Sequence, residues 1–160
     1  METLKIKLGN IYLLESELNG LSQTNQETGE STPILKGFIN EKLPLSTKFW
    51  LLELNKEVQA IKATLESLRE DLIKKYGTAN DQGQISIPLY QAGSEVYDTD
   101  GKLIDAKPNE AYIKFQEEYS GLINEEKELQ YTPIPLTVID KIETDETYSF
   151  ILQNLIEKIS

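Results

Sequence analysis

The sequence predicts an α+β fold that is mainly helical, and three patterns indicate it. Apolar residues recur at helical spacing along residues 45–76 and again along 109–128, with a turn-rich stretch over 78–108 between them. The first residues alternate apolar and charged side chains, which is typical of a short half-buried strand. We therefore expect a single domain over residues 1–160, built on a long antiparallel helical hairpin with coiled-coil-like packing and a small β-hairpin insert.

The N-terminal region predicts a strand, a short helix and a polar segment. Alternation from Leu4 to Leu8 indicates the strand, and helical spacing from Ile11 to Leu21 predicts the helix. Residues 22–33 contain no apolar side chain other than the closing proline. This stretch predicts a polar loop, or an arm that a partner orders.

The helix over 45–76 is the strongest structural signal, because its apolar residues form a heptad a/d stripe sustained for about three heptads. The stripe consists of Leu51, Leu54, Val58, Ile61, Leu65, Leu68 and Leu72. In the second helix, the same period is repeated by Tyr112, Phe115, Tyr119 and Leu122. Two pairings follow from this period: a hairpin within the chain, in which the middle of the first stripe is buried against the second, or self-association of two copies.

Within the insert, Asp100-Gly101 lies between two strand-like flanks and predicts a β-hairpin with a type I′ turn. A calcium loop is the alternative interpretation of the same acidic residues. Aligning Gly101 with the glycine of such a loop places Val96 at the first ligand position and Lys107 where a bidentate glutamate is needed. The hairpin is therefore favoured, and we expect no metal site.

The C-terminal region is broken by prolines over Thr132–Pro135. Residues 136–142 then predict a strand, and residues 144–159 predict a final helix with Tyr148 and Leu152 on its apolar side.

Composition excludes much of enzyme chemistry. The chain has no cysteine and no histidine, so thiolate or imidazole metal sites and serine–histidine catalysis are impossible. Adjacent acidic pairs such as Glu117-Glu118 project about 100° apart on a helix and do not form a catalytic dyad by themselves. Carboxylates from distant positions could still assemble a site, but no motif marks one. We expect a non-enzymatic protein with no catalytic residues and no cofactor.

The formal net charge of −11 is concentrated in the second half of the chain. Residues 81–160 contain 6 Lys/Arg against 16 Asp/Glu, a net charge of −10. Such a field repels phosphate backbones and anionic lipid, so we expect no direct contact with nucleic acid or membrane. No apolar stretch is long enough for a signal sequence or a membrane span, which predicts a cytoplasmic location. The acidity serves either solubility or a basic partner.

Three residues are candidate partner contacts: Trp50, Tyr148 and Leu152. Trp50, beside Phe49, falls outside the heptad stripe that begins at Leu51. Either the core widens to take its ring, or it is an exposed anchor of the kind that dominates interfaces.

The segment from Leu43-Pro44 to about Ile142 resembles a family of small uncharacterised proteins of tailed bacteriophages. The residues that match the family pattern are Lys75-Tyr76-Gly77, Asp100-Gly101, Phe115–Glu118 and Ile134-Pro135. The Ser22–Pro33 segment and the region after Ile142 depart from this pattern, and no functional residue is carried over.

The resemblance implies a structural or assembly protein, a small accessory component that docks on a head, neck or tail element. Its partners would be other phage structural proteins or further copies of itself, in the host cytoplasm and then in the virion. The charge distribution leaves a second reading open: an acidic anti-defence inhibitor that mimics nucleic acid and blocks a host enzyme.

Overall fold

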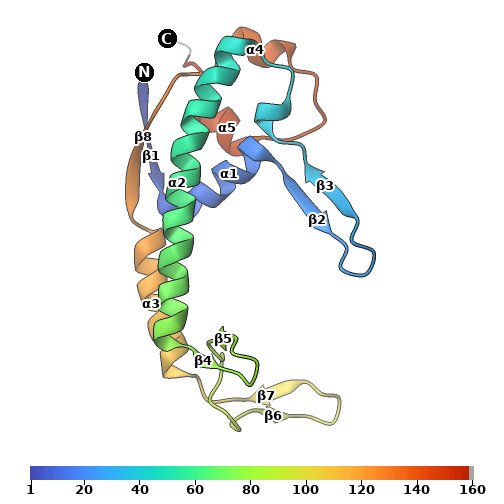
Figure 1. Cartoon of the computed structure of the whole chain (residues 1–160), viewed down its shortest axis with the longest axis vertical. Helices are drawn as coiled ribbons and strands as arrows, with labels where there is room; N and C mark the ends of the chain where they lie inside the picture. Colours follow the sequence, from blue (N-terminus) through green and yellow to red (C-terminus); the bar gives the residue numbers. More distant parts are fainter. Residues whose placement is uncertain (159–160) are drawn as a thin grey trace. The chain divides into compact units, whose positions relative to one another are not determined.

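The computed structural model describes residues 1–158 and shows the mixed α+β class that the sequence predicts (Figure 1). Its contacts divide the chain into two compact units. Unit 1 combines Met1–Ala63 with the C-terminal stretch from Glu125, and unit 2 is Thr64–Asn124. The sequence predicts a single domain over residues 1–160, and within it the contacts cluster in these two parts.

Unit 1 contains a two-stranded antiparallel ribbon, of which the sequence predicts only the N-terminal strand. Strand β1 (Glu2–Lys7) is the expected N-terminal strand, and it pairs with β8 (Glu126–Tyr131). The predicted second helix is therefore too long, since α3 (Glu110–Ile123) ends before residue 128 and the chain continues as β8. Leu129 and Tyr131 are buried, which explains why this charged segment is extended.

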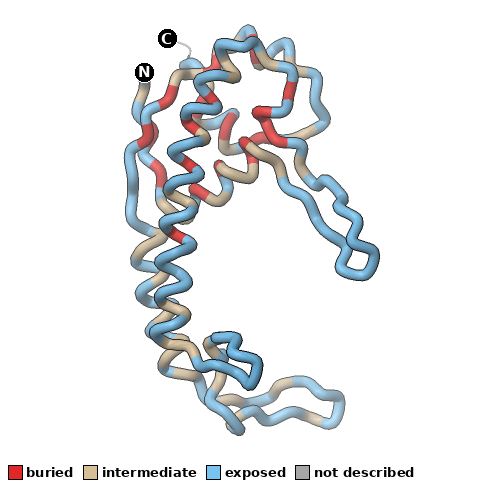
Figure 2. Tube along the Cα trace, in the orientation of Figure 1, coloured by how far each residue is buried: buried red, intermediate tan, exposed pale blue. Residues whose placement is uncertain are grey.

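The core of unit 1 forms where α1 (Ile11–Asn19), the first part of α2 (Leu45–Tyr76) and α5 (Ser149–Asn154) contribute buried side chains. Figure 2 shows these buried stretches within unit 1. A short 3₁₀ helix, Phe38–Asn40, packs beside α1 and adds Phe38, whose ring meets Tyr148 edge to face at a centroid distance of 5.2 Å. The bounds of α2 confirm the predicted long helix at 45–76.

Two predictions for the C-terminal region are wrong. Residues 136–142 do not form a strand: α4 (Leu136–Lys141) is a helix, because the carbonyl of Pro135 accepts the backbone N–H groups of Val138 and Ile139 at 3.0 and 3.3 Å. The β-branched residues of this segment suggested a strand, but the proline places the chain at the start of a helical turn.

The final helix is also shorter than the predicted 144–159, and residue 159 lies outside the described residues. Its start at Ser149 is set by Glu17 of α1, whose carboxylate accepts the N–H groups of Phe150 and Ile151 at 3.1 and 3.2 Å. A carboxylate at this position satisfies donors that a helix N-terminus leaves free.

The predicted polar loop or arm at 22–33 is a β-hairpin arm formed by β2 (Leu21–Thr24) and β3 (Ser31–Leu35). At its base, Gly20 and Gly37 have φ values of 92° and 100°. Gly20 lies against the backbone of Leu35 and Lys36, and Gly37 lies against that of Asn19 and Gly20. A Cβ at Gly20 would lie 2.5 Å from the Lys36 carbonyl oxygen, so only glycine fits there.

Unit 2 consists of the C-terminal part of α2, helix α3 and two small hairpins. Strands β4 (Thr78–Ala79) and β5 (Ile85–Ser86) form one hairpin, and β6 (Val96–Tyr97) and β7 (Leu103–Asp105) form the other. Helix α3 lies beside this part of α2 (Figure 1), and Lys75 forms an ion pair with Glu118 at 3.3 Å.

The β6–β7 hairpin confirms the predicted hairpin, but the type I′ turn is wrong. A type I′ turn needs two residues with positive φ, and here only Gly101 has one. The Asp98 carboxylate accepts the N–H groups of Asp100 and Lys102 at 2.9 and 2.8 Å. Its carboxylate therefore organises the turn itself.

The heptad stripe is only partly covered. Val58 and Leu65 are buried, whereas Leu68 is 40% exposed and Ile61 is half-buried. On α3 the aromatic residues of the matching stripe are half-buried, with Phe115 and Tyr119 stacked at 5.8 Å. The prediction that the whole middle of the stripe is buried is therefore wrong at Ile61 and Leu68.

Candidate docking surface

The part of α2 that belongs to unit 1 has three faces with different surroundings: one is buried, one contacts α1 through polar side chains, and one is apolar and exposed. The exposed apolar face defines the candidate site. One face is buried in the core through Leu51, Leu54 and Val58, which follow one another at helical spacing. Because this face is fixed in the core, the side chains on the remaining faces have defined directions.

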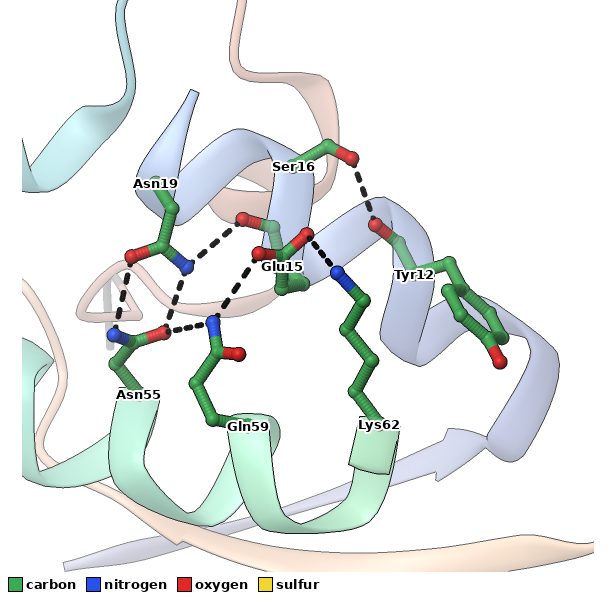
Figure 3. A network of polar contacts seen from close by, with 7 residues as sticks. All are labelled: Tyr12, Glu15, Ser16, Asn19, Asn55, Gln59 and Lys62. Carbon is green, nitrogen blue, oxygen red and sulfur yellow. Dashed lines mark hydrogen bonds and ion pairs between the residues drawn. The ribbon is translucent and has the colours of Figure 1, made fainter. Parts of the chain in front are cut away.

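A polar network holds a second face of α2 against α1 (Figure 3). The side-chain amides of Asn19 and Asn55 bond to each other in both directions, at 2.8 and 3.1 Å. Glu15 accepts a hydrogen bond from Gln59 at 3.2 Å and forms an ion pair with Lys62 at 3.4 Å. These contacts resist rotation of α2 about its axis.

A third face of α2 is apolar but exposed. Leu45, Phe49 and Leu52 lie at positions i, i+4 and i+7, so they share one side of the helix. Leu45 is 85% and Phe49 is 53% exposed. We call these three residues the apolar stripe. Large apolar side chains gathered on an exposed face are typical of interaction surfaces.

Beside the stripe lies a shallow depression of about 190 Å³, which we call the Trp50 shelf. Its walls include Met1, Trp50 and Leu54, together with Tyr131 at the end of β8. Trp50 is 36% exposed, and its ring meets that of Phe49 edge to face at 5.0 Å and 79°. The two rings hold each other in place, which joins the shelf to the apolar stripe.

The phenol of Tyr131 is anchored at the shelf. It donates a hydrogen bond of 2.9 Å to the carboxylate of Glu2. Burial, followed by this hydrogen bond, raises the pKa of Tyr131 to about 12. Tyr131 therefore stays protonated and its ring fixed at any physiological pH.

The three predicted contact residues have different surroundings. Trp50 and Leu152 are both exposed. Tyr148 is only 1% exposed, and its phenol donates a 2.9 Å hydrogen bond to the buried carboxylate of Glu41. Burial, with the hydrogen bond to Glu41, raises the pKa of Tyr148 far above its usual range. A partner cannot reach this ring, so the choice of Tyr148 as a contact is corrected to a core role.

The apolar stripe and the two buried glutamates, Glu17 and Glu41, are not among the residues predicted from the sequence. The stripe could have been found, because Leu45, Phe49 and Leu52 recur at helical spacing outside the a/d positions. Glu17 and Glu41 gave no such signal, since their partners lie more than a hundred positions away in the sequence.

Among residues 1–158, no group of three or more Asp or Glu side chains is placed to hold a metal ion. No helix in this described part is long and apolar enough to cross a membrane. Comparisons with protein-family models, curated proteins and solved structures found no match to this chain.

Proposed function

We propose that the protein is a non-enzymatic structural or assembly protein of a tailed bacteriophage, an accessory component that docks on another virion protein. The observation that carries the docking role is the apolar stripe of Leu45, Phe49 and Leu52, with Trp50 beside it. Burying such side chains against a partner is favourable by about 25 cal/mol for each Å² of apolar area. The phage context rests on the resemblance over Leu43–Ile142.

The alternative function, an acidic mimic of nucleic acid, needs unpaired carboxylates along one exposed face. Several acidic residues of the segment 81–160 instead lie opposite lysines or form ion pairs with them. In the β1–β8 ribbon, Glu128 lies opposite Lys5 and Glu126 lies opposite Lys7, while on α3 Glu118 pairs with Lys75. These pairs reduce the negative field along the acidic segments and favour the docking role.

Self-association is a second possible use of the helices. The exposed Leu68 and the half-buried aromatic stripe of α3 leave apolar surface in unit 2 that a coiled-coil-like contact would cover. In the proposed function this contact accompanies docking through unit 1 and does not replace it.

The direct test is mass spectrometry of phage particles purified from the source of this chain. We expect the protein in a fixed stoichiometric ratio to a known virion component. Its absence from particles, in infected cells that contain the protein, would contradict the proposal and favour the inhibitor.

A variant series links this result to the stripe. Phe49→Ala and Leu52→Ala, singly and together, should lower incorporation into particles and leave thermal stability unchanged, because both side chains are exposed. Leu13→Ala is a matched control, since Leu13 is an exposed leucine of α1 in the same unit. Docking through apolar anchors should change little with salt, whereas docking through the acidic half should weaken steeply.

A further inference from the structure

We propose that the Trp50 shelf binds an arginine side chain of the docking partner. The inference deepens the proposed docking role and rests on it for the identity of the partner. The preference of the shelf for arginine is a property of the isolated chain and can be tested separately.

The shelf has the shape and the walls for one long side chain. Its volume of about 190 Å³ is far below the 300–1,000 Å³ that is usual for drug-sized ligands. The buried residues Leu54 and Tyr131 line it, together with Trp50, which is 36% exposed. Such walls suit the aliphatic stem of an arginine and the stacking of its planar guanidinium on an indole.

Two carboxylates supply the charge complement. Trp50, Glu53 and Glu57 occupy positions i, i+3 and i+7 of α2, so both glutamates line the same flank of the helix as the indole, and both border the shelf. The carboxylate of Glu53 forms an ion pair with the ammonium group of Lys56 at 2.8 Å. The side chain of Glu57 forms no ion pair or hydrogen bond within residues 1–158, so its carboxylate is available to a cation.

The combination of an indole with two nearby carboxylates favours arginine over other side chains in the Trp50 shelf. An apolar side chain would leave the carboxylates unused, and an anion would be repelled by them. A lysine ammonium would satisfy the charge but lacks the planar group that can stack on Trp50 and donate two parallel hydrogen bonds to one carboxylate.

The test uses the full chain and the emission of Trp50, which is the single tryptophan of the sequence. The probes are N-acetyl-arginine amide, its lysine counterpart and the neutral isostere N-acetyl-citrulline amide, each titrated at matched ionic strength. We expect a saturable change of emission with arginine. Citrulline should bind at least about fivefold more weakly, and lysine should fall between the two.

A matched pair of variants locates the binding. Glu53→Gln with Glu57→Gln should weaken arginine binding by about fivefold or more. Glu66→Gln with Glu70→Gln removes the same charge at the same i,i+4 spacing on the same helix and should leave binding unchanged.

Three results would each overturn the inference: binding of citrulline as tight as that of arginine, equal binding of lysine, or full binding by the Glu53/Glu57 double variant. Because this titration involves neither particles nor the apolar stripe, its failure is distinguishable from a failure of the proposed function. Thermal melting of each variant shows that a loss of binding is not a loss of folding.

Discussion

Units 1 and 2 are built from the same long helix but differ in how they bury apolar side chains. In unit 1, α1, the first part of α2, the β1–β8 ribbon and α5 all contribute buried side chains, and nearly every buried apolar residue described belongs there. In unit 2, Leu65 is the single described apolar residue that is fully buried, and the other large apolar side chains are half-buried or exposed. A heptad period alone therefore does not determine whether a stripe becomes a core.

The polar contacts follow the same division. Unit 1 contains two buried glutamates, Glu17 and Glu41, and each accepts hydrogen bonds from the C-terminal segment. Most described polar side-chain contacts of unit 2 lie at its surface, as the Lys75–Glu118 pair does, and the cap that Asn109 provides for α3 is only part-buried. We infer that unit 1 is a rigid frame for the proposed docking surface, and that unit 2 opens more easily.

The largest expected effect comes from a core deletion in unit 1. Leu14→Ala should lower the free energy of unfolding by about 2–5 kcal/mol, because Leu14 is completely buried and the change leaves a cavity. Leu68→Ala in unit 2 should cost less than about 1 kcal/mol, because Leu68 is largely exposed already. Urea denaturation of the two variants measures both values, and similar losses would remove the contrast between the units.

A smaller effect is expected from the buried phenol of unit 1. Tyr148→Phe removes the hydrogen bond to the Glu41 carboxylate while keeping the ring against Phe38. The loss should be about 1.5–3 kcal/mol, the usual range for a hydrogen bond to a charged group. Thr144, which also donates to Glu41, keeps the carboxylate partly satisfied, so a larger loss would point to repacking of the core.

Alkaline pH should weaken unit 1 through its two buried tyrosines. In the folded chain the pKa of Tyr131 is raised to about 12 and that of Tyr148 is raised further, whereas an unfolded tyrosine has a pKa of about 10. The unfolded state therefore loses its protons first, and stability that is complete below pH 10 declines as the pH rises toward 12. Denaturation midpoints across this range should fall, and the fall should be shallower in Tyr131→Phe.

The smallest effect is expected at the surface of unit 2. Lys75→Gln removes the ion pair with Glu118, but both side chains are largely exposed and water screens the interaction. We expect no measurable change in thermal stability. A clear loss would show that unit 2 depends on this contact more than its exposure indicates.

These differences also separate what the sequence could predict from what it could not. The long helix, the first strand and the hairpin at Asp100-Gly101 were predictable, because period, composition and turn residues are local signals. Strand β8 was missed because it has only two buried apolar residues and its pairing partner, β1, lies at the other end of the chain.

The candidate site was predictable only in part. Trp50 stood out because its large aromatic ring falls outside the heptad stripe that begins at Leu51. Its exposure leaves it available to a partner. The choice of Tyr148 failed because the carboxylate that holds it, Glu41, lies 107 positions away. The Trp50 shelf joins α2 to the end of β8, and no local pattern relates those two segments.

Hydrogen exchange of backbone amides tests the contrast between the units most directly. If unit 1 is the rigid frame, amides of α1 and β8 should exchange only through global unfolding, and amides of α3 should exchange at least about tenfold faster through local opening. Equal protection of α3 and α1 would contradict this account, because it would mean that unit 2 is as stable as unit 1 without a comparable core.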